Sequence, residues 1–236
     1  MAETFNSGLG GDGSDTLANK LGQYIEIYHI PSEQSVKFKA YLTTFTDQYS
    51  SNFESALAFG RMDPIQTFQG TQRILSLGWD VPAASFLESK TNLTKASKLI
   101  SMLYPSYEAG DGGASTISAP PLFKIKFLNL IQNASAPGAA RGEAQVDGLL
   151  GTISGFTYEP DIESGFFQPT QAGGDAEAED AFKLFPQTIK FNCEFTVLHQ
   201  HKLGWEDSQG DERDGFNKFP YNNAHRKDAT LQNTDR

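Results

Sequence analysis

Short runs in which apolar and polar residues alternate recur along this chain, and the clearest begins at Ile189. Successive side chains of a β-strand point to opposite faces, so alternation with a period of two predicts a strand with one buried face. A chain that repeats this pattern folds around β-sheet. In this run the apolar face carries Ile189, Phe191, Cys193, Phe195 and Val197, and the polar face carries Lys190, Asn192, Glu194 and Thr196.

Further strands are predicted over residues 22–31, 34–45, 73–81, 122–131 and 146–167, where alternation or a short apolar run lies between turn residues. The 18 phenylalanines gather in such runs, which also favours β structure. In the strand over 34–45, alternation places Val36, Phe38, Ala40 and Leu42 opposite Lys37, Lys39 and Tyr41. In the strand over 73–81, it places Leu75, Leu77 and Trp79 on one face. In the strand over 122–131, it places Phe123, Ile125 and Phe127 opposite Lys124, Lys126 and Leu128.

The period changes after Pro82, where the spacing of apolar residues becomes helical. Ser85 and Glu88 have the spacing of a capping box, and Pro105 marks a helix end, so we predict an amphipathic helix over about residues 85–104. Its apolar arc would carry Phe86, Leu93, Ala96, Leu99, Ile100 and Leu103.

These elements together predict a mainly β (α+β) fold: an antiparallel β-barrel or sandwich with one flanking amphipathic helix and long loops. Residues 1–20 are rich in Gly, Ser, Asp and Asn and predict a flexible N-terminal arm, and residues 206–236 predict a polar C-terminal arm. The β domain is expected to span residues 21–205.

The charge balance limits the partners of such a domain. The net charge is −10, and an acidic chain lacks the basic footprint that gripping nucleic acid requires. The single cysteine, Cys193, excludes an internal disulfide and a multi-cysteine metal site. The first residues show no signal-peptide pattern, and no run of 18 apolar residues occurs. We therefore expect that the protein assembles in a cytoplasm and does not associate with a membrane.

Few residues suggest cofactor or metal chemistry. The segment GLGGDG at residues 8–13 matches the dinucleotide-binding glycine pattern, but it lacks the preceding strand and following helix that such a site needs. His199 and His201 share one side of a strand end and are the weak metal candidates. Zinc usually takes three or four protein ligands, so we expect no metal site and no cofactor.

Hydrolytic chemistry is likewise weakly supported. Glu159, Asp161 and Glu163 offer carboxylates that a glycosidase could pair, but they follow a proline-containing turn, and a solvated acidic turn is the favoured interpretation. Ser154 does not lie in a nucleophile-elbow pattern. The sequence therefore predicts no enzyme activity and no catalytic residue.

The segment FGRMDP at residues 59–64 has two interpretations. Pro64 disfavours helix at Asp63, and an Asp side chain can stabilise a turn by bonding to its own backbone. Alternatively, Arg61, Asp63 and Pro64 contact a neighbouring subunit, and Gly60 permits close approach. Both interpretations stay open on the sequence alone.

Five segments in order resemble the baseplate tube proteins of contractile-tailed bacteriophages, of the tail-tube-initiator or hub-adaptor type. The resemblance covers most of residues 55–205, and its individual motifs are loose. The segments are FGRMDPIQTFQGTQRILSLGWDVP, LISMLYPSY, APPLFKIKFLNLI, GLLGTISGFTYEPDIESGFF and LFPQTIKFNCEFTVLHQHKLGW.

The resemblance implies a tail-tube-like β-barrel that assembles as a hexameric ring in the virion. Such a ring would join the central baseplate hub, beside the wedge proteins, to the tail tube protein, whose polymerisation it would template. DNA would pass through its channel without specific binding. Strand edges left unpaired in one copy would be paired by the next.

Three alternatives remain beside this expectation. The chain could be another tail component, such as a sheath initiator, terminator or wedge protein. It could be a baseplate-associated cell-wall hydrolase that uses Glu159, Asp161 or the two histidines. It could also be a binding module of unrelated origin.

Overall fold

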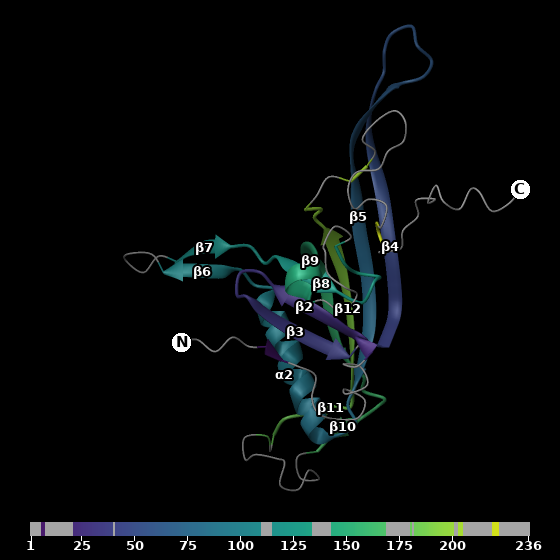
Figure 1. Cartoon of the computed structure of the whole chain (residues 1–236). Helices are drawn as coiled ribbons and strands as arrows, with labels where there is room; N and C mark the ends of the chain where they lie inside the picture. The colour runs from purple at the N-terminus through teal and green to yellow at the C-terminus, as the bar shows by residue number, and fades with distance from the viewer. Residues whose placement is uncertain are drawn as a thin grey trace, which may run out of the picture. The chain divides into compact units, whose positions relative to one another are not determined.

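The computed structural model of this protein describes residues 6–7, 21–39, 41–109, 115–133, 143–168, 180, 182–200, 203–204 and 219–221. The chain is mainly β, with antiparallel sheet and one main helix, which confirms the predicted fold class. Its internal contacts divide it into two units: unit 1 holds residues 1–39, 105–150 and 198–236, and unit 2 holds residues 40–104 and 151–197. Figure 1 gives the elements by label and by colour along the chain.

Unit 1 is built on a central strand, β2 (Tyr24–His29), which pairs antiparallel with β3 (Gln34–Lys39) and with β8 (Phe123–Lys126). The strand predicted over 34–45 is divided, because β3 ends at Lys39 and the next strand begins at Tyr41. The unit also contains β1 (Asn6–Ser7), which pairs parallel with β3, a separate hairpin of β6 (Ser106–Ala109) and β7 (Ser115–Ala119), and the short helix α3 (Ala144–Asp147).

Alternation misplaced two lysines of unit 1. Lys39 and Lys126 were expected on the polar face, but both are buried. The Lys126 ammonium lies 3.9 Å from a carboxylate oxygen of Asp147, which α3 supplies. Burial lowers the pKa of Lys126, and the nearby charges of Asp147 and Glu26 act in the opposite direction. At Lys126, a second covering element, α3, therefore makes a predicted polar position a buried one with a compensating charge.

Unit 2 contains four neighbouring strands in the order β9, β12, β5, β4. Their bounds are β4 (Tyr41–Ala56), β5 (Ile65–Pro82), β9 (Leu149–Pro160, in this unit from Gly151) and β12 (Thr188–Val197). The alternation predicted for β12 is confirmed, and Trp79 of β5 stacks on Phe191 at a centroid separation of 5.3 Å. The buried face includes Leu75, Leu77, Trp79, Ile189, Phe191, Cys193 and Phe195.

The predicted helix is confirmed as α2 (Phe86–Met102). Ser85 accepts a hydrogen bond from the Glu88 backbone N–H at 3.2 Å, and the Glu88 carboxylate accepts one from the Ala84 N–H at 2.6 Å. Its buried face is more polar than predicted, because the Ser89 hydroxyl donates to the Pro186 carbonyl at 2.6 Å. That carbonyl lies in β11 (Phe185–Pro186), which pairs with β10 (Phe166–Phe167). The buried helix residues are Phe86, Glu88, Ser89, Asn92, Lys95, Ala96, Leu99 and Met102.

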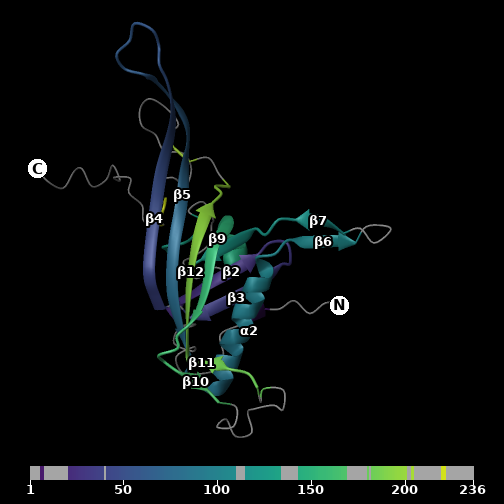
Figure 2. The same ribbon diagram turned by 180° about the vertical axis from the view of Figure 1, so that it is seen from behind.

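Strands β4 and β5 continue well past their neighbour. β12 pairs with β5 only over residues 74–82, whereas β4 pairs with β5 along residues 65–80. Residues 49–73 therefore form a hairpin extension of two strands and a turn, here called the β4–β5 extension. Both views of unit 2 show it running beyond the end of β12 (Figures 1 and 2).

Candidate assembly interface

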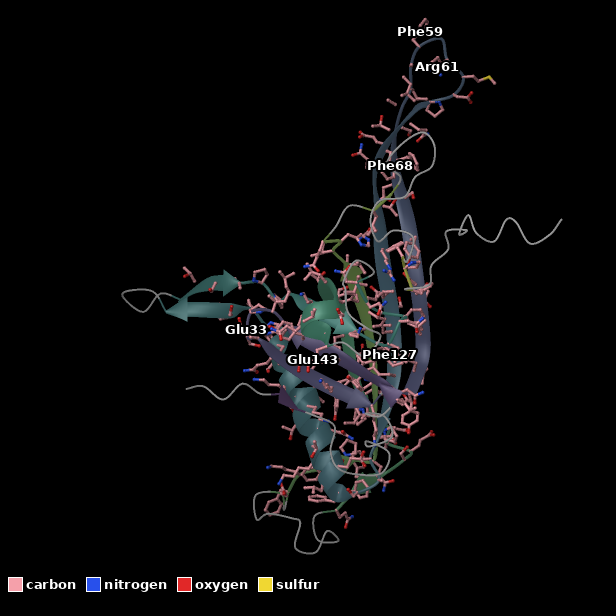
Figure 3. The ribbon with its side chains drawn as sticks, in the orientation of Figure 1. Glu33, Phe59, Arg61, Phe68, Phe127 and Glu143 are labelled. Carbon is pink, nitrogen blue, oxygen red and sulfur yellow. The ribbon has the colours of Figure 1, made fainter. Side chains whose placement is uncertain are left out.

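The sequence-predicted contact residues Gly60, Arg61, Asp63 and Pro64 all lie in the turn of the β4–β5 extension. Arg61 donates its backbone N–H to the Ala58 carbonyl at 3.2 Å, and Gly60 has φ +84°, a conformation that favours glycine. Figure 3 shows Arg61 and Phe59 at the far end of the extension, with Phe68 nearer the sheet. The segment is a turn, but the hydrogen bond described in it joins Arg61 to Ala58 and does not involve the Asp63 side chain. An exposed turn is compatible with a role in contacting a neighbour.

Apolar side chains surround this turn, and the sequence reasoning missed them. Phe59 is fully exposed at 110% and Met62 at 97%, and Leu57 is almost fully exposed. We call Leu57, Phe59, Arg61, Met62 and Asp63 the tip. Burying a large apolar side chain gains about 1.5–3 kcal/mol, so the tip presents groups that a partner would stabilise. The available signal was the apolar residues flanking Gly60 in LAFGRM.

The middle of the extension is held by side-chain pairs across its two strands. Phe53 and Phe68 are register partners with ring centroids 5.4 Å apart, and both rings are more than half exposed. Gln69 donates to the Glu54 carboxylate at 2.9 Å. Within the described ranges, residues 65–73 of β5 pair with β4 alone, and β4 pairs with β5 alone. A two-stranded ribbon is only marginally stable in water, so its open edges favour a further strand.

The root of the extension is fixed by a buried ion pair. The Arg73 guanidinium donates two hydrogen bonds to the Asp47 carboxylate, at 3.0 Å and 2.7 Å, and both side chains are nearly inaccessible to solvent. Tyr49 donates its hydroxyl to the same carboxylate at 2.9 Å, and its ring lies 5.3 Å from the guanidinium carbon. Bidentate pairing fixes direction as well as distance. This contact therefore holds β4 and β5 in a fixed orientation at the point where the extension begins.

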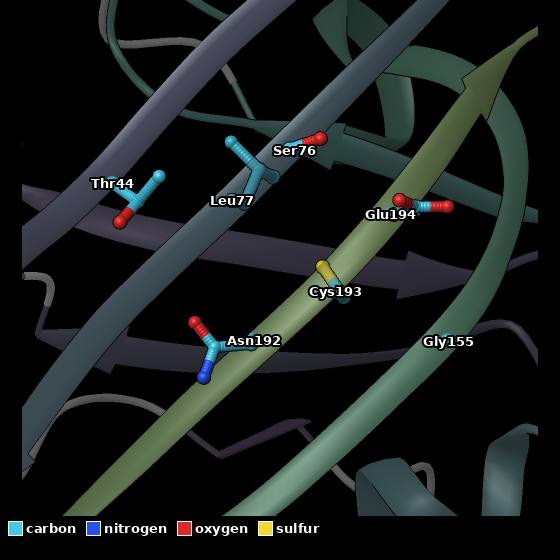
Figure 4. Close-up of a pocket in the computed structure, with 7 residues that line it drawn as sticks. All are labelled: Thr44, Ser76, Leu77, Gly155, Asn192, Cys193 and Glu194. Carbon is cyan, nitrogen blue, oxygen red and sulfur yellow. The ribbon is translucent and has the colours of Figure 1, made fainter.

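A hollow of about 410 Å³ lies on unit 2, away from the tip (Figure 4). Its titratable lining groups are the Glu194 carboxylate and the Cys193 thiol. Burial raises the pKa of Cys193 to about 12, with the neighbouring Glu194 charge adding to the rise. These groups do not form a nucleophile–base pair. The lining residues are Thr44, Ser76, Leu77, Gly155, Asn192, Cys193 and Glu194.

The Cys193 thiol is expected to be inert in the folded protein. Because the thiolate is the reactive form, a disulfide-exchange reagent at pH 8 should modify Cys193 about a hundredfold or more slowly in the native state than in urea. The raised pKa also predicts that the contribution of Cys193 to stability is constant below the unfolded thiol's pKa near 9 and falls as pH rises from there toward 12. Equal modification rates in both states would contradict this assignment.

The three carboxylates considered for hydrolysis lie at the end of β9 and in the turn after it. Asp161 accepts the Ser164 hydroxyl at 2.6 Å and the Glu163 N–H at 3.3 Å. The hydrogen bond from Ser164, followed by the charge of Lys190, holds the pKa of Asp161 below its usual value. Glu159 is a register partner of Lys190 on the exposed face of the sheet. This arrangement keeps the Asp161 carboxylate ionised, whereas a general acid must be protonated.

The remaining candidates are only partly described. The His199 ring lies edge-on to Phe219 at 5.8 Å, whereas His201 and the glycine segment 8–13 lie outside the described residues. Among residues that the structure describes, no group of three or more His, Cys, Asp or Glu side chains is placed to hold a metal ion. In the same part of the chain, no helix has the length and apolar character to cross a bilayer.

No protein-family model and no curated protein matches this chain. No residue role is therefore transferred from a relative.

Proposed function

We propose that this chain is a virion structural protein of a contractile phage baseplate. In this proposal, identical copies form a ring, with six as the expected number, that joins the central hub to the tail tube and templates tube polymerisation. The observation that carries the proposal is the β4–β5 extension, with its open strand edges and its fully exposed Phe59.

The extension is more readily explained by assembly than by a function of the isolated chain. Among the described residues, no further strand pairs with its two outer edges, and its tip exposes large apolar side chains. Monomeric proteins usually protect their strand edges and avoid large exposed apolar patches. Where both are exposed, they commonly mark a site that a partner covers. A neighbouring copy, or the first ring of tube protein, would supply that cover.

The polar face of the unit 2 sheet suits the wall of a DNA channel. In two neighbouring rows across β12, β5 and β4, Asn192 lies beside Gly78 and Thr44, and Glu194 lies beside Ser76 and Thr46. These two rows carry one carboxylate, Glu194, and no Lys or Arg, and phosphate binding depends on Lys and Arg. This composition supports passage of DNA rather than grip, and the proposal makes this face the channel lining.

Imaging the purified chain with the tail tube protein of the virus that encodes it tests the proposal. Negative-stain micrographs should show rings or short tubes, and tube growth should start sooner when this chain is present. A protein that stays monomeric at every concentration and leaves the lag of tube growth unchanged would overturn the proposal.

Substituting Asp63→Ala should leave the monomer folded and weaken self-association. Asp63 lies in the exposed turn, and an exposed ion pair with a neighbour contributes up to about 1 kcal/mol. The dissociation constant from sedimentation velocity should therefore rise by about two- to fivefold. If the circular dichroism signal of the monomer falls instead, Asp63 stabilises the turn and not a contact between copies.

A further inference from the structure

Unit 2 exposes a second apolar group besides the tip, close to β10 and β11. Phe182 is fully exposed at 101%, and its neighbours in this group are all more than half exposed. The segments that carry these side chains are held together by the pairing of β10 with β11 and by the packing of Phe86 against Phe185, and exposed apolar groups on such neighbouring segments mark interaction sites. We call this group the base; it consists of Leu87, Ile162, Phe182 and Leu184.

The elements beneath the base are firmly anchored. The ring of Phe86, next to Leu87, packs edge-on against Phe185, next to Leu184, at a centroid separation of 4.8 Å. Lys90 of α2 lies 2.8 Å from a carboxylate oxygen of the buried Asp180. Since Phe86 and Phe185 are buried and their sequence neighbours are exposed, the base is a presented surface that needs little ordering on binding.

The tip and the base lie at opposite ends of one strand. β5 begins at Ile65, beside the tip, and ends at Pro82, after which the Ala83 N–H donates to the Gln187 carbonyl next to β11. At about 3.3 Å per residue, its 18 residues span about 60 Å. Figures 1 and 2 show the hairpin turn and the β10–β11 pair far apart in unit 2. The two apolar groups of one copy therefore cannot cover each other.

Their charges are complementary as well. The tip carries Arg61 and Asp63, while the base is flanked by the exposed Glu163 and by the half-exposed Lys183, whose ammonium also lies 3.5 Å from the buried Asp180 carboxylate. When the two surfaces face each other, Arg61 can meet the exposed Glu163 carboxylate, and Asp63 can approach the ammonium of Lys183 from its solvent side. Contacts between unlike surfaces repeat from copy to copy, and in a closed ring every tip and every base is covered. A tip-to-tip dimer would leave both bases exposed.

We propose that the tip of one copy docks on the base of a second copy, head to tail. This inference rests on the proposed function, because it names the contact through which identical copies associate.

Cysteine cross-linking tests the contact directly in a Cys193→Ala background. Met62→Cys marks the tip and Phe182→Cys marks the base. Mild oxidation of a mixture of the two single variants should give a disulfide-linked pair containing one of each, with little cross-linking in either variant alone. Cross-linking of Met62→Cys alone would indicate tip-to-tip contact and overturn the inference.

Polar substitutions give a second readout. Phe59→Ser and Phe182→Ser should each raise the dissociation constant of self-association at least tenfold, and combining them should add little, because both remove one contact. Val146→Ser is the matched control: Val146 is also exposed and apolar but lies in unit 1, so its dissociation constant should stay within twofold. If rings form but the mixed cross-link does not, the tip-to-base contact is wrong and the proposed function still stands. If the chain never associates, the proposed function is wrong as well.

Discussion

A variant in which residues 52–70 are replaced by the dipeptide Asn-Gly is expected to be a folded monomer that no longer assembles. Ser51 and Thr71 are register partners, with hydroxyls 3.3 Å apart, and would flank the new two-residue turn. Asn-Gly is the favoured sequence for a tight hairpin turn. The deletion spares the buried face around Trp79 and the ion pair of Asp47 with Arg73.

Sedimentation velocity and electron microscopy would measure the loss of assembly, and thermal unfolding would report the fold. We expect the melting temperature to change little, because the removed segment contributes no residue to the buried core. A variant of full length with Leu57, Phe59 and Met62 all changed to Ser serves as the control for chain length. Normal rings from the shortened chain would contradict the role given to the extension.

Asp47→Ala should be among the most destabilising single substitutions in unit 2. It would leave the Arg73 guanidinium buried without the carboxylate that accepts two of its hydrogen bonds. Breaking a buried ion pair by removing one partner costs about 3–5 kcal/mol, which exceeds the cost of most point substitutions. Urea unfolding followed by tryptophan fluorescence would measure the change in the free energy of unfolding.

The double variant Asp47→Leu/Arg73→Met separates charge from packing. It removes both charges and keeps apolar volume, so it should recover much of the stability that Asp47→Ala loses. Glu54→Ala, in the exposed part of the same strand, should cost less than about 1 kcal/mol. A loss below about 1 kcal/mol for Asp47→Ala would show that the pair does not hold the root of the extension.

The sequence predicted the elements well where a single rule decided them. Alternation located β12, and the capping residues Ser85 and Glu88 located the start of α2. It failed at Lys126, because α3 covers that side of β8 and supplies Asp147. The helical spacing likewise gave no sign that Ser89 is buried; it is buried because its hydroxyl donates a hydrogen bond to a carbonyl of β11. Alternation reports which residues share a face, but not how many faces the tertiary structure buries.

The turn at the centre of the proposed interface was predicted only in part. The glycine and proline around Arg61 indicated a turn, and the structure places that turn at the end of a long hairpin. The length of the hairpin was not visible, because the strands of the extension are exposed on both faces and so show no alternation of apolar and polar residues. The burial of Arg73 did have a signal: it shares strand parity with Leu75, Leu77 and Trp79, and so belongs to the apolar face.

Imaging the full-length chain alone, over a series of concentrations, tests most directly whether identical copies close around a pore. Mass photometry would count the copies in each particle, and negative-stain averages would show their shape. The proposed function predicts closed rings of one stoichiometry with an open centre, which disappear when residues 52–70 are replaced by Asn-Gly. Monomers throughout the series, or open aggregates that form equally well without the extension, would contradict it.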